Sequence, residues 1–503
     1  MRKSVFRVVS LLMVMVLLVS VTMTGCGKKE VEKVQKTSEV AANPYEKALP
    51  MTMQFYGDKS IVSPGTEEIA AKKMKDLYNI DLKIDFMDRG SYVEKLNVMI
   101  AAGTYGDVIL FNDRQKMGQA VNSGLVVPLT DIVKNDDVWK KVDPAFLKSG
   151  LINGEYYFLP VVKPIPVSFN YRADWAKKLN IKTPTNPDEL YAMLYAFAKK
   201  DPDGNGKDDT YGITMQGDFK NSNPIWQMYL PSYPYELGLY YDEKSDAIKS
   251  IYSLVEDMKA ELTWLNKAYK EGVLDKEFLV AKNTDTESKF VTGKVGTWMF
   301  PAQYIMPRYE KIKANFPDAD TTAIPVFKTK YGSIYTETDE AVSDGFFLTK
   351  KCTDKARGMK FMSYWSGPEA LKDRNMGEEG KNYKVENGKI TWLNENAKKV
   401  YNPGSFVTSV HDIKLDEAVP VLEKSLANIK GFEIIKGIAS IKAESAVYKS
   451  KSVDLNKMGN ETLLKMIMGE TPIEKYDDIL AQMKKIGLDE VVQDMNKVYK
   501  SKK

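Results

Sequence analysis

Residues 82–111 read LKIDFMDRGSYVEKLNVMIAAGTYGDVILF, and this stretch decides the fold class. Apolar and charged residues alternate through 82–86, apolar residues recur at helical spacing through 92–102, and 108–111 is an unbroken apolar run. These patterns predict a strand, an amphipathic helix and a buried strand. A strand–helix–strand unit of this length places its two strands parallel in one sheet.

The same order occurs upstream, where residues 51–56 read as a strand and 65–78 as an amphipathic helix. We therefore expect an α/β fold with a mostly parallel sheet flanked by helices. Ligands of such sheets bind beyond the carboxyl ends of the strands. The residues that follow the first three strands include four candidate ligand-binding side chains: Tyr56, Arg89, Asp113 and Arg114.

A second α/β block begins after residues 152–154, whose Asn-Gly pair predicts a hairpin turn. Two strand-like segments follow, at 156–161 and 167–171, and prolines 160, 164 and 166 separate them. Prolines restrict an extended connection without forming a helix, which suits a crossover between domains. The segment 345–349 reads as the return crossover, and Asn387-Gly388 lies in a hairpin pattern.

The first 25 residues have the features of an export signal. Arg2, Lys3 and Arg7 precede an apolar run from 8 to 23, and the signal ends in Met23-Thr24-Gly25-Cys26. This ending resembles a bacterial lipobox, in which the cysteine is acylated, for example with palmitate, and the peptide is cut before it. We expect Cys26 to anchor the mature chain at the extracytoplasmic face of the cell membrane. The alternative is an ordinary signal peptide followed by an unrelated cysteine.

The segment 26–49 is charged and poor in large apolar residues, which predicts a flexible tether. Cys352 is the only other cysteine, so a lipidated chain has no internal disulfide. The formal charge is +4, and the signal carries three of the basic side chains. A nearly neutral mature chain shows no bias toward nucleic acid.

Several motifs in order along the chain resemble one family. Residues 99–109 (MIAAGTYGDVI), 122–125 (NSGL), 169–172 (FNYR) and 290–296 (FVTGKVG) look like landmarks of bacterial extracellular solute-binding proteins of the maltose-binding type. Residues 377–380 (GEEG), Tyr383 and 387–389 (NGK) narrow the resemblance to long lipoproteins of oligosaccharide importers. The resemblance covers nearly the whole mature chain.

The resemblance implies a two-lobed, type II periplasmic-binding-protein-like fold with a multi-crossover hinge. Lobe 1 would comprise residues 50–167 and about 346–395, and lobe 2 residues 168–345 and about 396–503. A monomer would close on an oligosaccharide and deliver it to the permease subunits of an ABC transporter.

The resemblance also suggests binding residues. Asp113 and Arg114 resemble an Asp-Arg pair that binds sugar hydroxyls after the third strand, although the spacing that follows differs by a few residues. Aromatic rings suit the C–H faces of pyranoses. The aromatic candidates for the cleft are Tyr56, Tyr171, Trp226, Trp298, Phe300, Tyr304 and Trp365. Core packing is the alternative for each ring.

Residues 201–212, DPDGNGKDDTYG, resemble the loop of an EF-hand. Asp201, Asp203, Asn205, Lys207 through its carbonyl, and Asp209 fall at alternating ligand positions for calcium. Gly212 replaces the usual closing glutamate, and Thr210 stands where an acidic ligand is common. A strand rather than a helix is expected next, which indicates a structural calcium ion and not a switch. In related proteins that bind acidic oligosaccharides, a similar loop holds a structural calcium. The alternative is an Asx-rich turn.

Two other functional classes remain possible at this stage. A secreted glycosidase or lyase would have a similar cleft, but no pair of carboxylates stands out, and His411 is the only histidine. The sequence has no P-loop, GxSxG or HExxH motif. A purely structural surface lipoprotein would not need the crossovers. We therefore predict a binding protein and not an enzyme.

Overall fold

The computed structural model describes residues 45–501 except 57–58, 60–61, 89–90, 112–119, 148–149, 153, 164, 339–344, 388, 404, 406–408 and 410–419. Residues 1–44, which include Cys26, lie outside the described residues. Ordered structure begins earlier than the predicted end of the tether. Asn79 Nδ2 donates to the carbonyl of Tyr45 at 2.8 Å, and Arg357 Nη1 donates to that of Lys47 at 2.8 Å. These bonds join the chain to the first domain from residue 45 onward.

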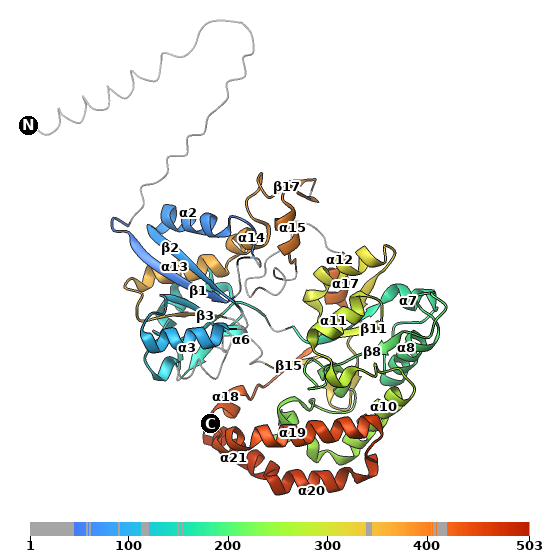
Figure 1. The fold of residues 1–503 in the computed structure, drawn as a ribbon. Helices are drawn as coiled ribbons and strands as arrows, with labels where there is room; N and C mark the ends of the chain where they lie inside the picture. The colour runs from blue at the N-terminus through green and yellow to red at the C-terminus, as the bar shows by residue number, and fades with distance from the viewer. Residues whose placement is uncertain are drawn as a thin grey trace, which may run out of the picture. The chain divides into compact units, whose positions relative to one another are not determined.

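The first sheet has the strand order β2-β1-β3-β16-β6 (Figure 1). Its strands are β1 (Leu49–Tyr56), β2 (Ile80–Met87), β3 (Val108–Phe111), β6 (Leu159–Pro160) and β16 (Gly345–Leu348). β1 pairs in parallel with both β2 and β3, as the repeated strand–helix pattern predicts. β16 is antiparallel to β3 and to β6, so four of the five strands run in the same direction and β16 runs against them.

The second sheet has the order β12-β7-β11-β8, with β7 (Val167–Arg172), β8 (Tyr211–Ile213), β11 (Val295–Pro301) and β12 (Thr321–Ala323). Three of its four strands, β8, β11 and β12, run in the same direction. β7 runs against them, since it is antiparallel to both β11 and β12, while β8 and β11 pair in parallel. The cause is topological: β7 enters directly from the first domain, so it runs away from the crossover while its neighbours run back toward it.

Helices cover both sheets. Those of the first domain are α2 (Thr66–Tyr78), α3 (Tyr92–Ala102), α5 (Thr130–Asn135), α6 (Pro144–Leu147), α13 (Lys355–Ser366), α14 (Pro368–Met376) and α15 (Glu395–Val400). Those of the second are α7 (Ala173–Lys178), α8 (Pro187–Lys199), α9 (Asn223–Trp226), α10 (Val255–Lys270), α11 (Asn283–Val291), α12 (Ile305–Asn315), α17 (Pro420–Asn428), α18 (Ala439–Glu444), α19 (Ala446–Met468), α20 (Tyr476–Ile486) and α21 (Leu488–Ser501).

Short two-stranded ribbons complete the described structure. They are β4 (Leu151–Ile152) with β5 (Glu155–Tyr156), β9 (Leu239–Asp242) with β10 (Ala247–Ser250), β13 (Lys328–Thr329) with β14 (Gly332–Ser333), β15 (Thr336–Thr338) with β19 (Glu433–Ile435), and β17 (Tyr383–Glu386) with β18 (Lys389–Trp392). The two predicted hairpins are confirmed as β4–β5 and β17–β18. Asn387 in the second turn has φ 53°, a left-handed conformation that asparagine tolerates well.

The described chain has a separate hydrophobic core around each sheet. The first is built from residues 49–159 and 346–365, and the second from residues 167–335 and 429–499. A smaller cluster packs β11 against α11, α12 and α17. β7 starts at Val167 and β16 at Gly345, within a residue of the predicted domain limits. α15 contacts α14 and β18 of the first domain, so that segment continues past residue 395.

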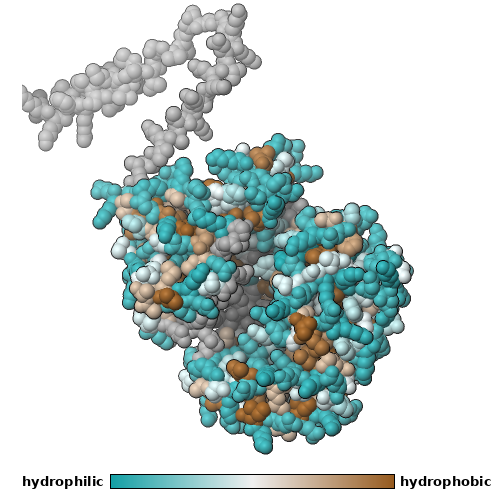
Figure 2. Space-filling model, viewed as in Figure 1, coloured by the Kyte–Doolittle hydropathy of each residue, from teal (hydrophilic) through white to brown (hydrophobic). Residues whose placement is uncertain are grey.

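The surface in Figure 2 is largely hydrophilic, with hydrophobic patches that are small and separate. Among the described residues, no helix is both long enough and apolar enough to cross a membrane. Cys352 is buried, and its thiol lies 3.2 Å from the carbonyl oxygen of Asp354. Burial, with a further contribution from the charge of Asp107, raises the pKa of this thiol to about 11. Cys352 is therefore a core residue rather than a reactive one.

Candidate functional site

The parallel strands of the first sheet end at the edge where the chain leaves and re-enters this domain. β1, β2 and β3 end at Tyr56, Met87 and Phe111. β6 ends at the same edge with Pro160, and β16 begins there with Gly345, which pairs with both Phe111 and Pro160. This is the edge at which solutes bind in open α/β sheets.

The second sheet has the equivalent edge. The last residue of β11, Pro301, pairs with Val167, which is the first residue of β7. β8 runs parallel to β11, and β12 runs antiparallel to β7, so these two strands also end toward that edge. In both sheets the strand ends therefore lie beside the segments that connect the domains.

Aromatic rings follow one another at the end of β11. Trp298 stacks on Phe300 with ring centroids 4.6 Å apart and planes 10° apart, and Phe290 stacks on Trp298 at 5.9 Å. Phe300 contacts Tyr304 at 5.5 Å. We call these four residues the aromatic column. Trp298 is buried, whereas Tyr304 is 36% exposed, so the column presents its last ring to solvent.

A cationic group lies against the aromatic column. The Arg308 guanidinium is 5.5 Å from the Trp298 ring and 5.7 Å from the Phe300 ring. Its Nη2 donates to Glu287 Oε2 at 2.7 Å, and Lys311 Nζ lies 3.1 Å from the other oxygen of Glu287. Partial burial raises the pKa of Glu287, but the hydrogen bond and charge of Arg308 outweigh it, and the pKa is lowered. The cation that contacts the column is therefore paired with the Glu287 carboxylate.

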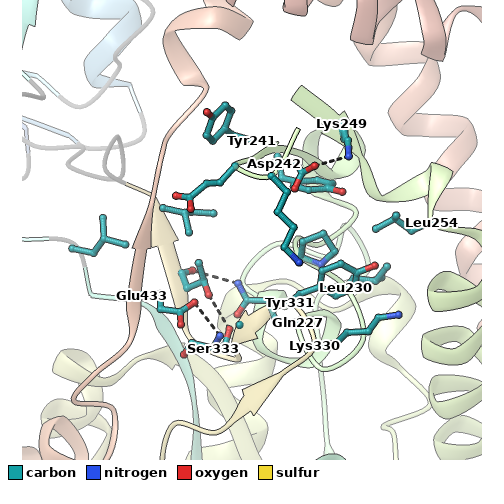
Figure 3. A pocket seen from close by; sticks show the side chains of 18 residues that line it. Gln227, Leu230, Tyr241, Asp242, Lys249, Leu254, Lys330, Tyr331, Ser333 and Glu433 are labelled. Atoms are coloured by element: carbon teal, nitrogen blue, oxygen red, sulfur yellow. Dashed lines mark hydrogen bonds and ion pairs between the residues drawn. The ribbon is translucent and has the colours of Figure 1, made fainter. Parts of the chain in front are cut away.

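A pocket of about 860 Å³ lies beside the β15–β19 ribbon (Figure 3). β15 ends at Thr338, shortly before β16 of the first sheet begins at Gly345, and β19 contributes Glu433 to the wall. The other walls come from β9, β10, and the β13–β14 turn. Its lining mixes rings, charges and amides: Gln227, Tyr240, Tyr241, Asp242, Glu243, Lys244, Lys249, Lys330, Tyr331, Ser333, Thr336 and Glu433, with Leu230, Pro231, Leu254, Gly332, Ile434 and Ile435.

Polar side chains of this pocket are held in place by one another. Lys249 Nζ is 2.5 Å from Asp242 Oδ2, and Glu433 accepts a hydrogen bond from the Ser333 amide at 3.1 Å. Gln227 Nε2 donates to the Thr336 carbonyl at 3.4 Å, while Gln227 Oε1 is buried and has no partner among the described residues. A buried amide oxygen without a donor is costly to the fold.

Three of the predicted cleft tryptophans are buried in hydrophobic cores. Trp226 packs edge-to-face on Phe219 at 5.2 Å, and Trp365 packs on Phe55 at 5.9 Å, directly below the end of β1. Together with Trp298 they are at most 1% exposed. In this structure core packing accounts for all three, and none offers a free ring face to a solute.

The remaining predicted residues divide into two groups. Tyr171 is buried near the far end of β7, because that strand runs away from the crossing edge. Phe300 is half-buried inside the aromatic column. Arg89, Asp113 and Arg114 lie outside the described residues, as does His411, and only the backbone of Tyr56 is described. The first-domain half of the predicted sugar site therefore stays a prediction.

Sequence reasoning missed several residues of the second domain. Gln227, Tyr240, Tyr331 and Glu433 meet in the Figure 3 pocket from segments up to 206 positions apart. Gln303 is buried at the end of β11, and its Oε1 has no partner among the described residues. The signal in the sequence that could have identified Gln303 is its position two residues after Pro301, just beyond the end of a predicted strand.

The loop at 201–209 follows α8 as predicted and folds around one side chain. Asn205 Nδ2 donates to Asp203 Oδ2 at 2.8 Å and to Asp209 Oδ1 at 3.1 Å. The Asp201 carboxylate accepts the amides of Asn205 and Gly206, both at 3.0 Å. Gly206 has φ 73°, which a glycine adopts without strain. The loop therefore curls its carboxylates inward, as a cation-binding loop would.

The charges of this loop are only partly compensated. Lys294 Nζ is 2.9 Å from Asp209 Oδ2. Burial and a hydrogen bond that protonated Asp203 donates to Asp201 raise the pKa of Asp203. No group of three or more His, Cys, Asp or Glu side chains among the described residues is arranged to hold a metal as it stands. The donors are nevertheless hard oxygens at alternating positions, which is the ligand set that calcium prefers.

Comparison with known proteins places the chain in a family. The model for bacterial extracellular solute-binding proteins matches residues 59–372, so the protein belongs to that family. The fold prediction is confirmed as well. The structure of the alginate-binding protein AlgQ2 without calcium ion superposes with a TM-score of 0.61 at 21% identity, covering 92% of this chain and 99% of that one. The N-glycan transport solute binding protein NgtS from Streptococcus pneumoniae gives 0.69 at 17%, covering 90% and 98%.

Two relatives come from Bacillus subtilis (strain 168). Lipoprotein LipO is 26% identical over 465 residues, which are 88% of this chain and 90% of LipO. The polygalacturonan/rhamnogalacturonan-binding protein YtcQ is 27% identical over 293 residues, 58% of this chain and 56% of YtcQ. The family is described as extracellular and solute-binding, YtcQ is named a binding protein, and LipO is named a lipoprotein.

Proposed function

We propose that this protein is the lipid-anchored solute-binding component of an ABC importer and that it captures an oligosaccharide between its two domains. The Figure 3 pocket carries the proposal. It combines the rings of Tyr240 and Tyr331 with carboxylates, ammonium groups and the side chain of Gln227. Rings suit the C–H faces of sugars, and charged or amide groups suit their hydroxyls. Relatives that bind polygalacturonan or fructooligosaccharides support this class of ligand.

The position of the pocket suggests how binding would be signalled. Thr336 and Glu433 line it from the two strands of the β15–β19 ribbon, and β15 continues directly into a crossing segment. A solute that contacts these strands and the first domain together favours the conformation in which both contacts exist. The permease subunits would then distinguish the loaded form from the empty one.

Calorimetry and thermal shift with the mature chain test the ligand class. The panel contains neutral and acidic oligosaccharides, peptides and amino acids. We expect at least one oligosaccharide to bind at micromolar concentration or below and to be recovered intact. Stabilisation by peptides alone would refute the sugar assignment, and cleavage of a bound sugar would favour a glycosidase or lyase.

We infer that Cys26 carries the lipid anchor, on the strength of the apolar run and the residues that precede it. In a bacterial host, Cys26→Ser should abolish incorporation of labelled palmitate and release the protein from the membrane fraction. Cys352→Ser is the matched control, because that thiol is buried in the first core. Equal membrane retention of Cys26→Ser and the parent protein would contradict the anchor.

We also propose that Asp201, Asp203, Asn205, Asp209 and the Lys207 carbonyl hold a structural calcium ion. The ion would replace Asn205 as the centre on which the carboxylates converge. At a free concentration one hundred times its Kd, calcium would stabilise the fold by about 2.7 kcal/mol. A calcium chelator should therefore lower the melting temperature, and Asp201→Asn should remove this sensitivity. Identical melting with calcium and with chelator would refute the site.

A further inference from the structure

A second hollow of about 1000 Å³ lies between α8 and α10. We call it the α8–α10 groove. Its rings are Tyr191 and Tyr195 from α8, Trp264 from α10, and Tyr229 from the segment after α9. α8 can supply them because its opposite face is buried in the second core. The exposed Ala192 and Ala260 leave room between the two helices.

Two of the four rings, Tyr191 and Trp264, are held in place before any ligand arrives. Tyr191 donates its hydroxyl to Glu271 Oε2 at 2.6 Å and meets Trp264 edge-to-face with centroids 5.3 Å apart. Lys267 Nζ lies 4.3 Å from the centroid of the Tyr191 ring. A preset ring loses little conformational freedom when a ligand stacks on it, so its contacts convert efficiently into affinity.

The chemistry of the lining fits a sugar chain better than a protein. The groove contains four aromatic rings with polar edges but no Leu, Ile, Val, Met or Phe. Tyr195 is 40% exposed, and the buried indole N–H of Trp264 has no partner among the described residues. Glu271 and Lys267 add an acceptor and a donor at the rim. Such alternation of flat apolar faces with hydrogen-bonding groups matches the surface of a pyranose.

We propose that the α8–α10 groove is a second carbohydrate-binding site, which holds a glycan chain by stacking on Tyr195 and Tyr191. It goes beyond the function proposed above, because it shares no lining residue with the Figure 3 pocket or with the aromatic column. A protein with two such sites can hold a glycan at this groove while the site between the domains carries the transported solute.

The test uses the mature full chain with three probes: cellotetraose, maltotetraose and tetragalacturonate. Calorimetry reports the stoichiometry and affinity, saturation-transfer NMR reports which sugar protons lie against the protein, and the groove variants locate the site. We expect one probe to bind at the groove, and Tyr195→Ala to weaken that event by about tenfold. Ala192→Arg fills the groove from an exposed position and should abolish the event. Binding of no probe, or groove variants that bind like the parent protein, would overturn the inference.

Two further variants separate this inference from the proposed function. Tyr331→Ala removes a ring from the lining of the Figure 3 pocket, and Val280→Ala changes a residue that is 81% exposed and belongs to neither site. If two events are seen, Tyr195→Ala should weaken one and Tyr331→Ala only the other. If the proposed function is wrong, a single event sensitive to Tyr195→Ala and Ala192→Arg remains. A single event sensitive only to Tyr331→Ala refutes the groove and leaves the proposed function intact.

Discussion

The aromatic column and the α8–α10 groove use rings in opposite ways. In the column, Trp298 is covered by Phe290 on one side and by Phe300 on the other. Neither face of the Trp298 ring is therefore left for a ligand. In the groove, the exposed Tyr195 has no ring contact among those seen in the described structure, and only Tyr191 and Trp264 touch. A self-stacked column supports a domain, whereas spaced rings leave surface for a ligand.

The column and the groove also differ in whether the carboxyl group next to each has a partner. Glu287 beside the column is held by Arg308 and Lys311, and its pKa is lowered despite partial burial. Glu261 on α10 adjoins the groove residues and is fully buried with neither oxygen hydrogen-bonded in the described structure. Burial raises its pKa well above the ordinary value. The carboxyl group beside the column therefore stabilises the fold through its partners, whereas the buried carboxyl group of Glu261 beside the groove destabilises it.

The largest expected effect concerns the column. Trp298→Ala removes a buried ring between two others and should lower the free energy of unfolding by about 3–5 kcal/mol. Denaturant unfolding measures this, and Tyr195→Ala is the control, for which a loss within about 0.5 kcal/mol is expected at an exposed position. Similar losses for the two variants would erase the distinction between supporting and ligand-facing rings.

The sequence predicted this distinction only in part. Strand–helix spacing located β1, α3 and β3, and Asn186 marked the start of α8, where its side chain accepts the Glu189 amide at 2.9 Å. The residue type alone did not predict that Trp298 is buried and Tyr195 exposed, because burial depends on packing partners that are distant in sequence. The pairing of β7 with β11, in which Val167 lies opposite Pro301 134 positions later, likewise cannot be predicted from local periodicity.

The second prediction concerns Glu261. Glu261→Met replaces an unpartnered buried carboxyl by an apolar chain of similar size and should stabilise the protein by about 1–3 kcal/mol at pH 8. The unfolded chain ionises at a lower pH than the folded one. Wild-type stability therefore falls as pH rises from the unfolded pKa toward the raised folded pKa. The gain should shrink toward pH 4.

Denaturant unfolding of Glu261→Met across pH 4–8 gives both the size and the slope of this effect. Glu256→Met is the matched control, since Glu256 is an exposed acid one and a half turns earlier on α10. It should leave both quantities close to those of the parent protein. A Glu261→Met variant no more stable than wild type at pH 8 would mean that the carboxyl has a favourable partner, and the contrast with Glu287 would fail.

The smallest effect is expected for Arg308→Met, which keeps an apolar contact to the column but removes the hydrogen bond to Glu287. The loss should be about 1 kcal/mol at pH 7, since Lys311 still faces the same carboxylate. A lowered folded pKa contributes stability above the unfolded pKa, and this contribution disappears as pH falls through the folded value. The difference in stability between variant and parent should therefore vanish in acid, which is opposite to the pH dependence expected for Glu261.

Unfolding curves from pH 3 to 7, with the more exposed Lys311→Met as control, measure this difference. A loss that persists unchanged at pH 3 would assign the role of Arg308 to its contact with Trp298 and Phe300 rather than to its charge.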